Sequence, residues 1–233
     1  MIFSAYSRSL GDEEKSSFKN IESAVWHAVE YFPELEKRSI CIYFYAREAA
    51  PRGSLASFIP LNHPHYYSKI MHLKVVAEFS IVFSKQMISL EEIDRFFIIC
   101  HEFEHVIQYI RSKKEYLYSC ILKDYGCDGT GFHMYKVPSE IDADRKAKCI
   151  LVRIYGQEKV DEFIKRFSSS SDARKQIFGD YIGNLNLSED YVFEKEVMKM
   201  WDEYDIDAKL DKLRGKRSMF HRRILENYAF ANE

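Results

Sequence analysis

The segment that begins at Ser89 constrains the fold most, because it predicts one long helix with a defined start. Ser89-Leu90-Glu91-Glu92 has the form of a capping box, in which Ser and Glu side chains bind backbone groups at a helix N-terminus. Apolar residues then follow at helical spacing for about six turns. They are Ile93, Phe96, Phe97, Cys100, Phe103, Ile107 and Ile110. This is the clearest helical pattern in the chain.

The part of the chain before this helix predicts one further helix and a small sheet. Residues 16–36 place Ile21, Val25, Ala28 and Phe32 at helical spacing. Residues 39–45 form a short β-branched and aromatic run, which predicts a strand, and an irregular loop is expected from there through His65. In residues 74–84 apolar side chains alternate with polar ones, which predicts a strand with one face in the core.

The part after it predicts mostly helix. Residues 124–131 have turn composition, and Pro138-Ser139 opens a helix that runs to about Tyr155 and stops at Gly156. Helical patterns continue from there, broken by the serines at 168–171 and by Gly179, Gly183 and Gly215. We therefore expect an α+β fold with a main domain at 1–156 and a helical extension or subdomain at 157–233.

The composition of the chain indicates its cellular environment and argues against some classes of binding partner. The 233 residues are 46% hydrophobic, and 34 basic against 36 acidic side chains leave a net charge of -2, so no overall charge would attract nucleic acid. Neither a leader pattern nor an apolar run long enough for a membrane span is present, so no membrane association is expected. Five cysteines without CxxC spacing argue against a disulfide framework and favour a reducing cytoplasm.

His101-Glu102-Phe103-Glu104-His105 is an HExxH motif within the predicted helix. Four residues bring both imidazoles to one side of a helix, where they can bind the same metal ion. Glu102 lies beside them and could deprotonate a water molecule. Chance predicts only about 0.02 such matches in a chain of this composition. The competing interpretation, two surface histidines on a charged helix face, is the weaker one.

Two histidines leave a catalytic zinc site incomplete, because such sites use three protein ligands and keep one position open. The metzincin pattern would need Gly at 108 and His at 111, where the chain has Gln108 and Arg111. Glu140 is the preferred third ligand, at the start of the helix predicted from Pro138. Asp144 follows it by one turn and could hydrogen-bond a ligand histidine through the free ring nitrogen. His133, in the preceding loop, is the main alternative.

These residues resemble the gluzincin metallopeptidases, in which a Glu within an ExxxD or ExxAD pattern on a following helix completes the HExxH site. The chain is most similar to the small prokaryotic and phage-associated HExxH proteins, of which the ImmA/IrrE family is the best known. The resemblance covers residues 70–155 and implies a small zincin-like sheet packed on the HExxH helix. It implies zinc bound by His101, His105 and Glu140, with Glu102 as general base and Asp144 supporting a ligand. Glu104 departs from the pattern, since those relatives carry a small or apolar residue there. It points to another side of the helix, so a solvated charge is expected rather than a fourth ligand, with a supporting role beside the ligands as the alternative.

Several other residues have competing interpretations. His133, Tyr135 and Arg145 are candidate donors to a developing oxyanion. Cys100 adjoins His101 but falls on the apolar stripe, so a core position is preferred over a cysteine nucleophile. The basic segment Lys209–Arg223 is expected to be a solvated helix face, with binding of nucleic acid or an acidic partner as the minor alternative.

The sequence therefore predicts a zinc-dependent metallopeptidase that acts on a protein or peptide, with the substrate added to the free edge of the sheet that includes residues 74–84. Two alternatives stay open. One is a zinc-binding regulatory or interaction protein without peptidase activity. The other is a zinc hydrolase of a non-peptide amide.

Overall fold

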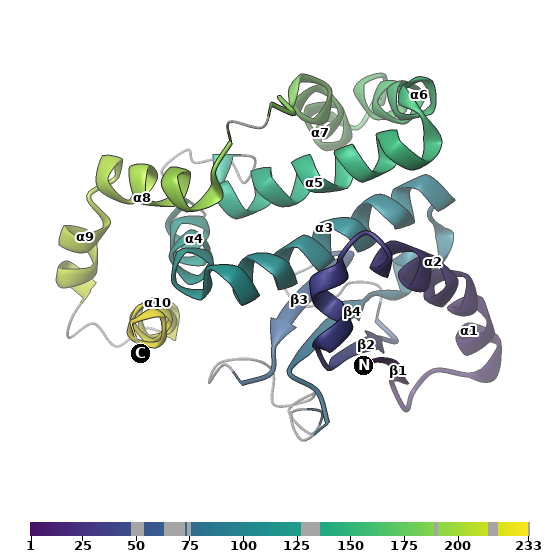
Figure 1. The fold of residues 1–233 in the computed structure, drawn as a ribbon, viewed down its shortest axis with the longest axis horizontal. Helices are drawn as coiled ribbons and strands as arrows, with labels where there is room; N and C mark the ends of the chain where they lie inside the picture. The colour runs from purple at the N-terminus through teal and green to yellow at the C-terminus, as the bar shows by residue number, and fades with distance from the viewer. Residues whose placement is uncertain are drawn as a thin grey trace. The chain divides into compact units, whose positions relative to one another are not determined.

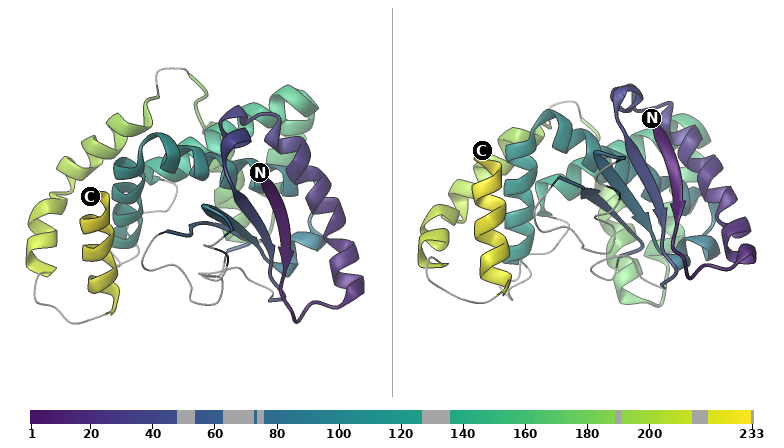
Figure 2. Two further views of the ribbon diagram at one scale, coloured as in Figure 1. Left: turned by 60° about the horizontal axis from the view of Figure 1, so that its bottom comes forward. Right: turned by 90° about the horizontal axis from the view of Figure 1, so that it is seen from below.

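A computed structural model of the chain describes residues 1–47, 54–62, 73, 76–126, 136–188, 191–213 and 219–232. Its fold is α+β, as predicted, with a small sheet and many helices (Figure 1). The sheet contains β1 (Ile2–Tyr6), β2 (Ile40–Phe44), β3 (Ala56–Pro60) and β4 (Phe79–Phe83) in the order β1-β2-β4-β3. β1, β2 and β4 are parallel, and β3 pairs antiparallel with β4 (Figure 2).

The strand predictions need three corrections. β1 was not foreseen, and β3 lies within the segment expected to be an irregular loop. β4 is shorter than the predicted 74–84, and all five of its residues are buried rather than one face only. The physical reason is its position between β2 and β3, with apolar residues covering both faces of the sheet. Ser80 is accommodated there because its hydroxyl donates to the Cys41 carbonyl at 3.1 Å.

Different groups of apolar side chains are buried on the two faces of the sheet. One face carries an apolar cluster of Cys41, Ile59, Leu61, Leu73, Ala77 and Val82. On the other face, Phe44 of β2 contacts Phe83 of β4 and the ring of Phe18, whose centroid lies 4.5 Å away. Phe18 is fully buried between α1 (Asp12–Ser17) and α2 (Lys19–Val29), so this face packs on the N-terminal helices.

The helix predicted at 16–36 is divided into α1, α2 and the 3-10 helix η1 (Pro33–Lys37). Its predicted apolar face is confirmed, since the four residues named for it are at most 1% exposed: Ile21, Val25, Ala28 and Phe32. Phe32 contacts Phe103 of the next helix, with ring centroids 5.5 Å apart. The apolar spacing therefore identified the buried face although the helix is not continuous.

The long helix is α3 (Glu92–Arg111). It begins after the predicted capping box, because Ser89 ends the 3-10 helix η4 (Lys85–Ser89) and its hydroxyl donates to the Gln86 carbonyl at 2.9 Å. Every residue from 102 to 109 is buried. The second half of α3 is thus enclosed instead of being amphipathic, and this enclosure removes the motif from Glu102 onward from bulk water.

The remaining helices are α4 (Lys113–Gly126), α5 (Pro138–Tyr155), α6 (Gln157–Ser168), α7 (Ala173–Asn184), α8 (Phe193–Glu203), α9 (Ile206–Leu213) and α10 (Met219–Ala231). α5 has the predicted bounds, and Gly156 after it has a φ of 81°, a conformation that favours glycine. The prediction of mostly helix after Gly156 is confirmed. Within the described ranges, no helix is both long and apolar enough to span a bilayer.

The described residues group into two compact units, Met1–Ile107 with Lys146–Leu185 and Gln108–Arg145 with Asn186–Glu233. The first holds the sheet, α1, α2, α6 and α7, and the second holds α4 and α8 to α10, while α3 and α5 each contribute to both. In the second unit, the ring of Tyr118 of α4 stacks on the ring of Trp201 of α8, with centroids 3.9 Å apart, and on the ring of Tyr228 of α10. The predicted boundary at residue 156 stays a prediction.

Gly179 and Gly183 were expected to interrupt a helix, but both lie inside α7. Gly179 is needed for close packing, not for a turn. A Cβ atom built on it would lie 2.3 Å from the backbone nitrogen of Ser168 and 2.8 Å from the carbonyl carbon of Phe167. The end of α6 therefore passes too close to α7 for any side chain at this position.

Gly179→Ala is expected to lower the free energy of unfolding by about 1–3 kcal/mol, because separating two backbones costs more than the roughly 1 kcal/mol that alanine gains in a helix. Urea unfolding would measure it. Gly183→Ala is the matched control in the same helix, since its new Cβ would meet only the flexible Ile164 side chain at 3.3 Å. Equal stability of the two variants would contradict the close-packing explanation.

Candidate metal centre

The HExxH motif lies in the enclosed central turns of α3, where the helix itself sets the relation between the two histidines. The imidazole rings of His101 and His105 are 4.6 Å apart between centroids and almost perpendicular, at 87°. His105 is 6% exposed, and His101 is partly exposed. Both rings therefore project from one side of α3, one turn apart, as the four-residue spacing predicts.

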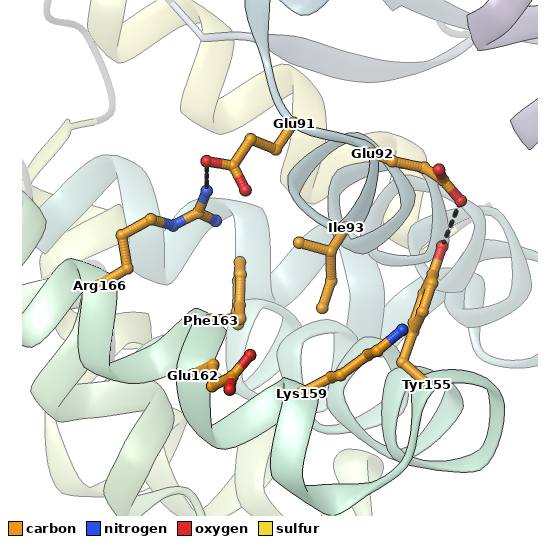
Figure 3. Close-up of a pocket in the computed structure, with 8 residues that line it drawn as sticks. All are labelled: Glu91, Glu92, Ile93, Tyr155, Lys159, Glu162, Phe163 and Arg166. Atoms are coloured by element: carbon orange, nitrogen blue, oxygen red, sulfur yellow. Dashed lines mark hydrogen bonds and ion pairs between the residues drawn. The ribbon is translucent and has the colours of Figure 1, made fainter.

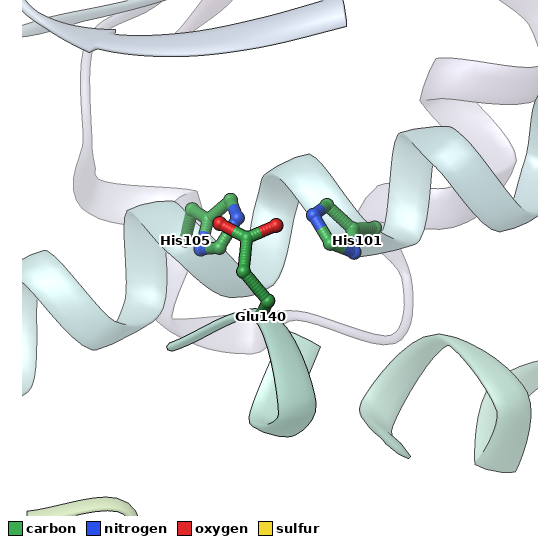
Figure 4. Close-up of side chains that lie close together, drawn as sticks. All are labelled: His101, His105 and Glu140. Carbon is green, nitrogen blue, oxygen red and sulfur yellow. The ribbon is translucent and has the colours of Figure 1, made fainter. Parts of the chain in front are cut away.

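Glu140 joins this pair from the first turn of α5. Potential ligand atoms of His101, His105 and Glu140 all lie within 4.8 Å of one another, and the carboxylate points toward the two imidazoles (Figure 4). Among the described residues this is the group of His, Cys, Asp and Glu side chains that could hold a metal ion. This group consists of the three residues that the sequence predicts as metal ligands.

Hydrogen bonds between α3, α4 and α5 explain why the start of α5 lies where it does. Gln108, one turn beyond His105, donates from Nε2 to the carbonyl of Ser139 at 3.0 Å and to Oδ2 of Asp142 at 2.9 Å. The backbone N–H of Ser139 donates to the hydroxyl of Ser119 on α4, also at 3.0 Å. The backbone beside Glu140 is thus held from two helices by contacts that do not involve the ligand side chain.

The donor set fits zinc. Two imidazole nitrogens and one carboxylate oxygen form a common ligand set for catalytic zinc, with bonds of about 2.0–2.2 Å and a fourth position left open. Ligand atoms around one such ion lie roughly 3.4 Å apart. A separation of at most 4.8 Å is close enough that small side-chain rotations would bring all three to one ion.

Lys123 is a site residue that the sequence analysis missed. From α4 its Nζ donates to Oε1 of Glu140 at 2.8 Å, in an ion pair whose side chains are 28% and 14% exposed, respectively. A carboxylate has two oxygens, and this bond involves one of them. The lysine charge would oppose a cation bound at Glu140, so a bound metal ion would be expected to lengthen this ion pair. The position of Lys123 beside Glu140 depends on the packing of α4 against α5, which the sequence pattern does not show.

Three acidic residues close to the candidate ligands along the chain are also buried. Glu102 is 7% exposed and Glu104 is 6% exposed, so the expectation that Glu104 is a solvated charge is wrong. The reason is the enclosure of α3, which leaves no solvated face at this turn. Asp144 is 5% exposed, one turn after Glu140 on α5. Neither Glu104 nor Asp144 belongs to the group with converging ligand atoms.

Of the three candidate oxyanion donors, Arg145 is the one that the structure describes. Arg145 donates from Nη2 to the Ser188 carbonyl, and its guanidinium lies over the ring of Tyr191, 4.6 Å from the centroid. His133 and Tyr135 lie outside the described residues, so the third-ligand alternative at His133 also stays open. Cys100 is fully buried, and burial raises the pKa of its thiol, which fits the predicted core position.

The basic segment Lys209–Arg223 is described only in part. Lys209 lies on α9 with its Nζ over the ring of Tyr204, 5.5 Å from the centroid. Residues 214–218 and the side chains of 219–223 lie outside the description. Binding of nucleic acid or an acidic partner at this segment stays the minor prediction.

A pocket of about 420 Å³ lies at the start of α3, more than two turns from His101 (Figure 3). Arg166 of α6 pairs there with Glu91, and the Tyr155 hydroxyl donates to Glu92 at 3.1 Å. Arg166 also pairs with Asp94. Arg166 thus bridges two acidic residues where α6 meets the start of α3, so the pocket is best explained as part of that helix contact.

Comparison with known proteins adds no constraint on this geometry. No protein-family model, curated protein or solved structure matches the chain. The resemblance to gluzincins therefore depends on the motif and on the ExxAD spacing alone. What function the site supports has to be argued from the residues that converge on it.

Proposed function

We propose that the protein is a zinc-dependent metallohydrolase, and specifically a peptidase, in which His101, His105 and Glu140 bind the metal. The observation that carries the proposal is the convergence of three ligand atoms from two helices that are separated in sequence. HExxH alone guarantees two neighbouring histidines on any helix. The position of the Glu140 carboxylate beside these histidines depends on the fold, and this carboxylate would be the third ligand that catalytic zinc needs.

Each residue of the motif would have a distinct role. A bound zinc ion would act as a Lewis acid toward the substrate carbonyl and lower the pKa of water toward about 7. Glu102 follows His101 directly and is buried, which suits it to accept a proton from the attacking water and to pass it to the leaving amine. Asp144 would hold a ligand histidine through its second ring nitrogen.

A peptide substrate is preferred because the sheet has a strand able to pair with one. β4 is internal, since it pairs with β2 on one side and β3 on the other, so a peptide cannot add to it directly. β3 pairs only with β4 among the described strands, which makes it an edge strand. An extended peptide could hydrogen-bond to its backbone, while side-chain pockets would select the sequence.

A gluzincin-like assignment is part of the proposal and is supported by the same elements. The resemblance implies three parts that the chain has: the HExxH helix α3, a later helix with Glu140 and Asp144, which is α5, and a small sheet. Glu104 is the departure from that pattern, and its burial shows that this fold accommodates a carboxylate there.

Protein purified without added metal is expected to contain about one zinc ion per chain, because the three ligand atoms converge at a single place. Elemental analysis would measure the content, and titration of chelator-treated protein would measure uptake. His105→Ala is the control and should lose the metal. A wild-type protein that neither contains nor takes up a transition metal would overturn the proposal.

Zinc content combined with an activity screen separates the remaining alternatives. Stoichiometric zinc with cleavage of a diverse peptide mixture supports the peptidase. Zinc without cleavage of any peptide, together with turnover of small acyl amides, would favour a hydrolase of non-peptide amides. Zinc with neither activity would favour a regulatory or interaction protein.

A further inference from the structure

We propose that Gln108 is a positioning residue for the metal centre, which holds the first turn of α5 so that Glu140 reaches the two histidines. The inference rests on the proposed metal site and goes beyond its three ligands. Gln108 is not part of the HExxH motif, and in the sequence it only distinguishes the chain from the metzincin pattern.

The geometry of α3 places Gln108 correctly for this role. It lies three residues after His105 and seven after His101, so all three side chains project from the same side of one continuous helix. Its side chain is 3% exposed. A buried amide is costly unless its polar atoms are paired, so its contacts determine its role.

Those contacts bracket Glu140 on both sides along the chain. Nε2 of Gln108 donates to the carbonyl of Ser139, which immediately precedes Glu140, and to the carboxylate of Asp142, two residues beyond it. Both partners are acceptors only, so the amide must present its NH₂ group to them, and both hydrogens are used. One side chain of the HExxH helix thus fixes the backbone on either side of the third ligand.

Ser119 completes the arrangement from α4. Its hydroxyl accepts from the N–H of Ser139 at 3.0 Å and lies 2.8 Å from the Ser139 hydroxyl, with all these groups buried. Ser139 is therefore held through its carbonyl by α3 and through its N–H by α4. Its neighbour Glu140 has little freedom of backbone position, and we infer that this pre-organisation contributes to metal affinity.

Gln108→Met removes the donor but keeps the length and approximate volume of the side chain. We expect zinc affinity to fall about 10–100-fold, the range found when groups that orient metal ligands are removed. Competition with a chromophoric zinc chelator would measure it, and circular dichroism would check the fold. Ser119→Ala should act in the same direction and deletes only one hydroxyl, so it keeps the test decisive if Gln108→Met does not fold.

Lys148→Met is the matched control. Like Gln108, Lys148 has a buried polar side chain, but it lies on α5, two turns after Glu140. Its Nζ donates to the Ile182 carbonyl at 2.8 Å, so the variant removes a hydrogen bond of α5 that does not involve Ser139 or Asp142. It should change stability but not zinc affinity. An equal loss of affinity in this variant would show that any damage to α5 weakens the site, and the positioning role would be rejected.

A double-mutant cycle tests whether Gln108 acts through Glu140. Adding Gln108→Met to Glu140→Ala should cause no further loss of zinc affinity, because the ligand being positioned is already absent. If the two substitutions reduced zinc affinity independently, so that their fold-losses multiplied, the inference would be overturned.

If His105→Ala binds zinc as tightly as the wild type, the metal site itself is wrong. If His105→Ala loses zinc while Gln108→Met and Ser119→Ala retain full affinity, only the positioning role is wrong.

Discussion

Glu102→Gln is expected to retain zinc and to lose about 10²–10⁴-fold in the rate of peptide hydrolysis. The amide has the shape of the carboxylate, and Glu102 is not among the three residues with converging ligand atoms, so metal affinity should stay close to that of the wild type. What is lost is a base able to accept a proton from water. The measurement is kcat on whichever peptide the wild type cleaves best, with zinc content determined on the same sample.

Glu104→Gln is the control that makes this result specific. Glu104 lies on the same helix two residues later and is as buried as Glu102, at 6% against 7% exposure. Both variants replace one buried carboxyl group of α3 by an amide. Only Glu102 occupies the catalytic position of the motif, so the control should retain most of the activity. If Glu102→Gln cleaved the peptide at the wild-type rate, the proposed peptidase mechanism would have to be abandoned.

The sequence predicted the elements that carry the site because their signals are local. α5 was found with its bounds because Pro138 opens it and Gly156, at a φ of 81°, ends it. The helix that carries HExxH was found because its apolar side chains repeat over many turns. HExxH then fixed the relation of two ligands through helix geometry alone.

The parts that were missed depend on contacts between distant segments. β3 is five residues long within a Pro- and Ser-containing segment, and only its pairing with β4 makes it a strand. The burial of Glu104 follows from the packing around α3, which the pattern of that helix does not show. Gln108 could have been suspected from its spacing to His105, but its acceptors on α5 are more than thirty residues away along the chain.

Removal of a ligand should abolish tight zinc binding, and Glu140→Ala is the most informative case. The two histidines that remain are an incomplete set, so we expect affinity to fall by more than the roughly 100-fold that marks the loss of an orienting group. Glu140→Ala also removes the negative partner that lies 2.8 Å from the Lys123 ammonium group, so the positive charge of Lys123 opposes a cation at the site more strongly. Chelator competition would measure the loss.

Thermal unfolding provides a second measurement. A ligand that binds only the folded state at 100 times its Kd stabilises that state by about 2.7 kcal/mol, so zinc should raise the wild-type Tm and leave that of Glu140→Ala unchanged. His133→Ala is the decisive comparison, because His133 was the alternative third ligand. It should keep both the affinity and the thermal shift. If His133→Ala lost zinc while Glu140→Ala kept it, the carboxylate would not be the third ligand, and the convergence of its oxygen with the two imidazoles would need another explanation.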